Sequence, residues 1–175
     1  LLHEDGARVV AVSDARGGVA NPDGLDVPAL FEHVRASGTV AGFPGGRPVS
    51  GDELLTLDCD VLLPAALDGA LTAELAPRVR AKLIVEGANA ATEPEADEIF
   101  EKRGIIVVPD ILASAGGVTV SYFEWVQNMQ QFTWEEDRVN AELEKVMREA
   151  YERVAHIAKT RHIPLRTAAY VIASA

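Results

Sequence analysis

Apolar residues in the first two thirds of the chain fall into short, nearly continuous runs separated by longer segments of mixed polarity. Such runs are typical of strands that are covered on both faces in a parallel sheet. The expected strands are residues 8–13, 60–64, 82–86 and 105–109. The expected helices between them are residues 27–36, a short segment from residue 50, 72–79 and 92–104. This order predicts right-handed βαβ units in an α/β fold with an open, doubly wound, mostly parallel sheet.

From residue 114 onward the pattern becomes helical throughout. The expected helices cover residues 115–131, from 133 to the proline at 164, and 166–173. Three Ser/Thr-x-x-Glu patterns mark helix starts, because each of the two side chains accepts a hydrogen bond from the other's backbone N–H. They begin at Ser50, Thr92 and Thr133. We therefore expect one domain, with a sheet part over residues 1–112 and a helical part over residues 113–175.

The first residues have the pattern of a last helical turn that is closed by Gly6, and the chain opens without Met. A dinucleotide-binding sheet places its glycine-rich loop roughly 20 residues before the acid that ends the second strand. If Asp14 is that acid, the loop and the first strand fall before residue 1. We therefore expect an incomplete domain that belongs to a longer protein.

The formal charge is −11, from 16 Lys and Arg against 27 Asp and Glu. Proteins that bind nucleic acid carry basic patches, so this balance argues against a nucleic-acid partner. No apolar run approaches the roughly 20 residues of a membrane-spanning helix, so we expect no membrane partner. The four histidines are scattered and Cys59 has the features of a small buried hydrophobe, so no metal site is expected.

Asp14 is the first candidate for chemistry, because it places a carboxylate at the end of an expected strand. At that position in a dinucleotide-binding sheet, an acid can accept hydrogen bonds from the adenosine ribose hydroxyls. The alternative is an acid that only caps a turn. Arg16 could instead bind a 2′-phosphate, so the cofactor is NAD or NADP, and the negative charge of Asp14 favours NAD.

Small and amide side chains follow the next two expected strands. Ala65 and Ala66 would let a flat ligand lie against the backbone, although simple packing is the favoured explanation of that segment alone. Asn89 can both donate and accept hydrogen bonds, as a ribose hydroxyl requires. A helix-capping turn is the alternative interpretation of the segment that ends at Asn89.

A pair of glycines, Gly116 and Gly117, opens the helix that follows the last expected strand. Each glycine disfavours a helix by about 1 kcal/mol, so the pair indicates close approach of a ligand or of another segment. Val118 and Ser121 are three residues apart and therefore share one face of this helix, where they offer an apolar wall and a hydroxyl.

Taken together, these motifs resemble the C-terminal, nucleotide-binding domain of glutamate dehydrogenases, within the superfamily of glutamate, leucine, phenylalanine and valine dehydrogenases. The matching segments are residues 10–14, 21–26, 64–66, 86–89, 115–125 and 166–170. The resemblance implies a Rossmann-like domain that binds NAD or NADP. It also implies a cytoplasmic, homo-oligomeric enzyme, usually a hexamer.

The resemblance implies a role for each candidate at the cofactor. Asp14 faces the adenosine ribose, and Ala65 and Ala66 line the cofactor path. Asn89 holds the nicotinamide ribose. Ser114 contacts the nicotinamide end, at a position that is commonly Asn in the family. Residues 90–91 are Ala-Ala, where the family frequently has Gly-Pro. We expect this difference to change only the local shape of the loop.

The substrate implied by the resemblance is L-glutamate, which is oxidatively deaminated to 2-oxoglutarate and ammonia. Val118 and Ser121 contact the substrate side chain, and the Ser121 hydroxyl bonds the γ-carboxylate. The family's catalytic lysine and aspartate lie on a substrate domain that no part of this chain resembles, so this chain holds no catalytic residue and is expected to be inactive alone. The alternatives are a branched-chain or aromatic amino-acid dehydrogenase and a non-catalytic nucleotide-binding module.

Overall fold

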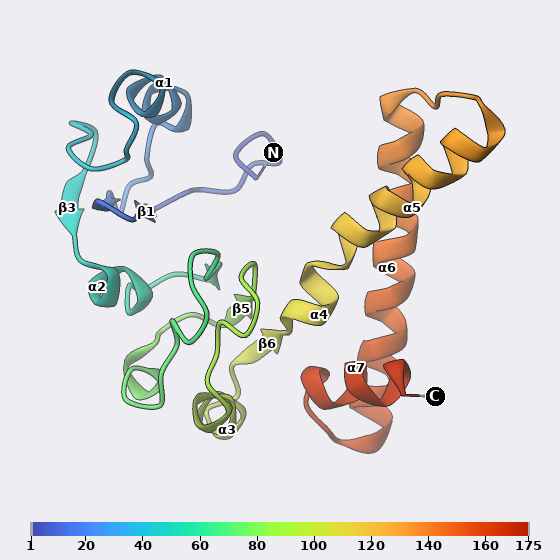
Figure 1. Ribbon diagram of the computed structural model, residues 1–175. Coiled ribbons are helices and arrows are strands. Elements are labelled where there is room, and N and C mark those ends of the chain that lie inside the picture. The colour runs from blue at the N-terminus through green and yellow to red at the C-terminus, as the bar shows by residue number, and fades with distance from the viewer. Residues whose placement is uncertain (1, 175) are drawn as a thin grey trace. The chain divides into compact units, whose positions relative to one another are not determined.

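The structure is a computed structural model that describes residues 2–174 (Figure 1). It separates into two compact units. The first comprises the residues up to Asp60 together with Pro77–Ala81, and the second comprises Val61–Ala76 and the residues from Lys82 onward. Each unit has its own three-stranded sheet.

The sheet of the first unit is antiparallel. It consists of β1 (Ala11–Asp14), β2 (Gly17–Ala20) and β3 (Arg47–Val49), in that order. The strand expected over residues 8–13 is therefore present, but its partner among the described residues is the antiparallel β2 and not a parallel strand. The strand β2 had no sequence signal because it opens with Gly17 and Gly18, and β3 is interrupted by Pro48.

Two helices complete the first unit. They are α1 (Val27–Ser37) and α2 (Gly51–Leu55). Asp26 caps α1 by accepting a hydrogen bond from the backbone N–H of Ala29 at 3.0 Å. The predicted start at Ser50 is confirmed, since its hydroxyl accepts from the backbone N–H of Glu53 at 3.2 Å. Leu30 of α1 is buried in a core with Val19, Leu25, Val40 and Phe43.

Residues 2–7 also bear out the local pattern that was expected before the first strand. The backbone N–H of Gly6 donates to the carbonyl of His3, and that of Ala7 donates to the carbonyl of Leu2. Gly6 has a φ of 87°, which is a conformation that glycine adopts readily. This pair of hydrogen bonds has the pattern of a Schellman motif, here in a turn over residues 2–6.

The sheet of the second unit is parallel, as the sequence predicts. Its strands are β4 (Val61–Leu62), β5 (Leu83–Val85) and β6 (Ile106–Val108), in the order β4-β5-β6. The helix α3 (Pro94–Lys102) connects β5 to β6 and contacts β6, with Ala96 and Phe100 fully buried. The second unit is therefore an α/β structure with a parallel sheet.

The prediction of a helix over residues 72–79 is wrong, because only the 3₁₀ turn η1 (Ala76–Arg78) forms there. Pro77 cannot donate a backbone hydrogen bond, and it disfavours helical geometry in the residue before it. The hydroxyl of Thr72 instead closes a local turn by accepting from the backbone N–H of Leu75.

Two of the three predicted capping boxes are also wrong. The N-cap of α3 is Glu93, whose carboxylate accepts from the backbone N–H of Ala73 at 2.9 Å. The long helix α6 (Glu136–Arg161) begins after Glu135 and not at Thr133. The turn before α6 is held instead by Gln127, whose side-chain oxygen accepts from the backbone N–H of Trp134 at 2.6 Å.

The C-terminal part of the second unit is helical. Besides α6, it contains α4 (Asp110–Ala113), α5 (Ala115–Gln130) and α7 (Leu165–Ala173). Figure 1 shows α5 and α6 side by side, and a Cβ atom at Gly116 would lie in ordinary van der Waals contact with Leu143 and Met147 of α6, at 3.7 and 3.8 Å. A second buried cluster joins α4, α6 and α7 through Leu112, Val154, Ala168 and Ala169. Across residues 2–174, no helix combines the length and the apolar character needed to cross a bilayer.

Candidate functional site

The carboxyl ends of β4, β5 and β6 lie along one edge of the parallel sheet, which is where open α/β sheets bind ligands. The loops after β4 and β5 are joined there. The backbone N–H groups of Gly87 and Ala88 both donate to the carbonyl of Pro64, each at 3.0 Å. The structure therefore brings Ala65, which follows Pro64, to the same edge as the loop that carries Asn89.

Gly87 allows this close approach. A Cβ atom at position 87 would lie 3.0 Å from the Cβ of Ala65, which is closer than ordinary van der Waals contact. Ala65, Ala66 and Asn89 are all exposed at this edge. The edge therefore offers small side chains against which a flat ring can lie, and an amide that can both donate and accept hydrogen bonds.

The variant Gly87→Ala is expected to lower the free energy of unfolding by about 1 kcal/mol, because the added methyl group pushes the two loops apart. Thermal unfolding of the full-length protein measures this loss. Gly51→Ala is the matched control, since no atom lies within 4 Å of its Cβ position, and it should keep or raise stability. An unchanged unfolding midpoint for Gly87→Ala would contradict the close packing of the loops.

The loop after β5 is fixed by Asp110, the first residue of α4. One carboxylate oxygen of Asp110, Oδ2, accepts from the backbone N–H of Ala90 at 2.7 Å, and the other, Oδ1, accepts from that of Ile111 at 2.7 Å. Ala90 has a φ of 47°, a left-handed conformation that costs a residue with a side chain about 1 kcal/mol. The carbonyl of Ala90 accepts from Gly69 at 2.8 Å, so the loop is held from both sides.

A buried ion pair lies beneath this loop. Glu86 is 0% exposed, and its carboxylate accepts from the Arg166 guanidinium at 2.8 Å and from the backbone N–H of Asp110 at 2.9 Å. Arg166 also donates to Asp97 and, at 3.5 Å, to Asp110. Burial alone would lower the pKa of Arg166, but the hydrogen bonds to Glu86 and Asp97 outweigh it and raise that pKa above its ordinary value.

Glu86 and Arg166 lie in segments that carry the family resemblance, but their ion pair was not predicted from the sequence. Two signals could have identified it. Arg166 lies in the first turn of α7, where the helix dipole disfavours a cation unless an acid compensates it. Glu86 directly follows a buried strand, where an ionised side chain needs a partner.

Ser114 and the substrate-side candidates lie near the diglycine, in the same unit. Ser114 joins α4 to α5, and its hydroxyl donates to the carbonyl of Asp110 at 2.6 Å, which leaves its lone pairs free to accept. Val118 is 76% exposed, and Ser121 is exposed one turn further along α5. Their positions on α5 agree with the shared face that their spacing predicts.

Asp14 belongs to the first unit and takes part in a turn. Its two oxygens accept from the backbone N–H groups of Arg16 at 2.8 Å and Val40 at 2.7 Å. The Thr39 hydroxyl and these two N–H groups lower the pKa of Asp14 to about 2, so the exposed carboxylate is ionised at neutral pH. Each oxygen has a further lone pair, so the turn does not prevent Asp14 from accepting a ribose hydroxyl.

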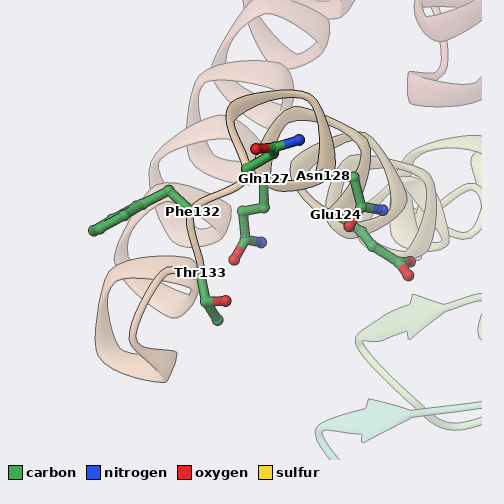
Figure 2. Close-up of a pocket in the computed structure, with 6 residues that line it drawn as sticks. Glu124, Gln127, Asn128, Phe132 and Thr133 are labelled. Atoms are coloured by element: carbon green, nitrogen blue, oxygen red, sulfur yellow. The ribbon is translucent and has the colours of Figure 1, made fainter.

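A separate hollow of about 480 Å³ lies at the turn between α5 and α6 (Figure 2). Its lining is mostly polar and consists of Glu124, Gln127, Asn128, Gln131, Phe132 and Thr133. These residues come from the second half of α5 and the turn after it, whereas the substrate-side candidates lie in the first half. The hollow is therefore not part of the candidate site. No group of three or more His, Cys, Asp or Glu side chains within residues 2–174 is arranged to hold a metal ion.

A sequence model of the family described as Glutamate/Leucine/Phenylalanine/Valine dehydrogenase matches residues 1–175. The chain is 54% identical over 173 residues to the glutamate dehydrogenase of Thermotoga maritima, and the match covers 99% of this chain and 42% of that protein.

Solved structures give the same result. The hetero-hexameric glutamate dehydrogenase of Thermus thermophilus, in its leucine-bound form, matches with a TM-score of 0.87 and 35% identity over 95% of this chain and 39% of that one. The glutamate dehydrogenase of Peptoniphilus asaccharolyticus matches with a TM-score of 0.79 and 33% identity over 97% of this chain and 39% of that one.

The chain therefore belongs to the glutamate, leucine, phenylalanine and valine dehydrogenase family, which confirms the resemblance stated from its motifs. It spans about two fifths of the length of the relatives it matches.

Proposed function

We propose that this chain is the nucleotide-binding part of an NAD(P)-dependent glutamate dehydrogenase, whose full-length form oxidatively deaminates L-glutamate to 2-oxoglutarate and ammonia. The observation that carries the proposal is the 54% identity to the Thermotoga maritima glutamate dehydrogenase across 99% of this chain. The full-length protein is proposed to be cytoplasmic and homo-hexameric. Its domain is proposed to be Rossmann-like, with the first strand and the glycine-rich loop contributed by residues before this chain.

The edge of the parallel sheet supports the cofactor assignment. Gly87, Ala65 and Ala66 are exposed and small, so they leave this edge of the sheet open to a flat ring. Asn89 is proposed to hydrogen-bond the nicotinamide ribose, and Ser114 to accept from the nicotinamide end with its free lone pairs. When bound, the nicotinamide supplies the hydride acceptor, while this chain orients the ring and shields it from water.

The first half of α5 supports the substrate assignment. Val118 and Ser121 are exposed on one helix face, where they can provide an apolar wall and a hydroxyl donor. The Ser121 hydroxyl is proposed to donate to the γ-carboxylate of glutamate, because a buried carboxylate needs a hydrogen-bond donor. A branched-chain or aromatic substrate would not use this hydroxyl.

The rest of α5 supports the proposal that the helical part packs against the substrate domain of the full-length protein. An exposed apolar stripe runs along this helix, with members three or four residues apart: Val118, Tyr122, Trp125 and Met129. Tyr122 and Trp125 stack with their ring centroids 5.8 Å apart. A contiguous apolar surface of this kind marks an interface. It begins at Val118, so the segment that covers it would also close over the substrate.

Initial rates of NAD⁺ and NADP⁺ reduction by the full-length protein test the proposed function. We expect reduction with L-glutamate and much slower reduction with leucine or phenylalanine. A preference for leucine or phenylalanine would contradict the proposal and would favour the alternative amino-acid dehydrogenases.

A second experiment tests the proposed preference for NAD. The ionised carboxylate of Asp14 repels a 2′-phosphate, so Asp14→Asn should raise the ratio of kcat/KM with NADP to that with NAD by roughly tenfold. Asp23→Asn removes another exposed carboxylate of the same unit and serves as the matched control. Because the pKa of Asp14 is about 2, its contribution to the ratio should stay constant across the neutral range of pH. An unchanged ratio for Asp14→Asn would show that Asp14 does not face the 2′ position.

A further inference from the structure

Arg166, in the first turn of α7, contacts carboxylates from three other segments. Nη2 donates to Glu86 at 2.8 Å and Nη1 donates to Asp110 at 3.5 Å. Asp97 accepts from two nitrogens, Nε and, at 3.4 Å, Nη2. Glu86 follows β5, Asp97 lies on α3 and Asp110 opens α4. A single planar guanidinium therefore joins four elements of the second unit.

Two of these carboxylates also hold the backbone of the candidate cofactor site. Glu86 accepts from the backbone N–H of Asp110 at 2.9 Å, and Asp110 accepts from that of Ala90 at 2.7 Å. Ala90 is the neighbour of Asn89. The carbonyl of Asp110 accepts from the Ser114 hydroxyl at 2.6 Å. The two residues assigned to the nicotinamide end are therefore both attached to backbone that Asp110 and Glu86 position.

The chemistry at this point favours arginine strongly. Glu86 is fully buried, and Asp97 and Asp110 are largely buried. Without a cation, three carboxylates would face one another in a region with little water, which is strongly unfavourable. A lysine would keep the charge but offers one nitrogen, which cannot reach three separate acids with the geometry of the guanidinium fork.

We propose that Arg166 is a positioning residue for the cofactor: through Glu86 and Asp110 it fixes the separation between the loop of Asn89 and the start of α4, which leads to Ser114. The expected change in KM for NAD or NADP rests on the proposed function. It assigns Arg166 no contact with substrate or cofactor. It also gives the last helix of the chain a role in cofactor binding, although that helix lies 50 or more residues beyond Ser114 in sequence.

The test compares Arg166→Lys with Val154→Ala in the full-length protein. Val154 is buried in the cluster that packs α7, so Val154→Ala loosens α7 without touching the acids. We expect both variants to lower the unfolding midpoint. Only Arg166→Lys should raise KM for NAD or NADP, by roughly tenfold, because small misplacements of binding groups are costly, while KM for glutamate changes less than about twofold.

A second readout does not depend on turnover. Amide hydrogen exchange at Ala90 and Asp110 should become faster in Arg166→Lys and stay unchanged in Val154→Ala, whether or not the protein oxidises glutamate. Faster exchange at these amides in Arg166→Lys, together with no glutamate activity in the parent protein, would support the positioning role of Arg166 and contradict the proposed function. Unchanged exchange and an unchanged KM for the cofactor would overturn the inference and leave Arg166 a structural residue.

Asp97→Asn provides a milder variant in case Arg166→Lys does not fold. The Asp97 side chain is 25% exposed, whereas Glu86 is fully buried, and among the described residues the Asp97 carboxylate bonds Arg166 rather than the backbone of the cofactor edge. Any change in KM for the cofactor in Asp97→Asn must therefore arise through Arg166. We expect KM for the cofactor to rise about threefold, with faster exchange at Ala90. If neither quantity changes in Asp97→Asn, the inference is wrong.

Discussion

Replacing Ser121 with valine in the full-length protein is expected to lower kcat/KM for glutamate by roughly 10- to 150-fold. The proposed hydrogen bond joins a hydroxyl to an ionised carboxylate, and such bonds contribute about 1.5–3 kcal/mol. Valine replaces the hydroxyl with two methyl groups that cannot donate a hydrogen bond, so the variant leaves the carboxylate without its donor. Initial rates with glutamate and with leucine measure the change, and the ratio of leucine to glutamate activity should rise.

Thr119→Val is the matched control for this variant. Thr119 lies two residues from Ser121 on α5, but its hydroxyl donates to the carbonyl of Ala115 at 2.9 Å. Its removal should change kcat/KM for glutamate by less than about twofold. If Ser121→Val kept full glutamate activity, Ser121 would not contact the γ-carboxylate, and the branched-chain and aromatic alternatives would gain support.

The variant Phe100→Ala is expected to lower the free energy of unfolding by about 3–5 kcal/mol, which is the usual cost of emptying a fully buried phenylalanine site. Phe100 is 0% exposed on α3, the helix that contacts β6. The lost side chain leaves a cavity between segments that cannot collapse freely, because β6 is paired to β5 along its length. Denaturant unfolding of the full-length protein, followed at the transition that includes this sheet, measures the effect.

Phe31→Ala provides the matched comparison for Phe100→Ala. Phe31 is 63% exposed on α1, so the same chemical change removes little buried surface. Its effect should stay within about 0.5 kcal/mol. Similar losses for the two variants would contradict the assignment of Phe100 to the core.

The parallel sheet was predictable because its three strands are short, continuous apolar runs, and such runs depend little on the rest of the fold. The antiparallel sheet was not. Gly17 and Gly18 give β2 no apolar pattern, and its place is set by packing, since a Cβ at Gly18 would lie 2.9 Å from Val49. A glycine selected by a tertiary contact cannot be distinguished from a turn glycine in the sequence alone.

Some features of the candidate site could likewise be predicted from local sequence patterns, and others could not. The small residues and Asn89 could be predicted, because their place after a strand is a local property of the sequence. The ion pair between Glu86 and Arg166 joins residues that lie 80 positions apart, so no local pattern reveals it. The capping boxes at Thr92 and Thr133 failed for a related reason. Glu93 accepts from Ala73, which lies 20 positions away, and Gln127 accepts from Trp134, which lies seven positions away.

The separation between Glu86 and Arg166 has a consequence for synthesis on the ribosome. Chains grow at roughly 5–20 residues per second, so Arg166 follows Glu86 by roughly 4–16 s. Until then Glu86 has no cation beside it, and an ionised carboxylate resists leaving water. The carboxyl end of β5 therefore stays hydrated during this interval. The edge where the cofactor is proposed to bind is therefore completed only when α7 has followed β5 off the ribosome.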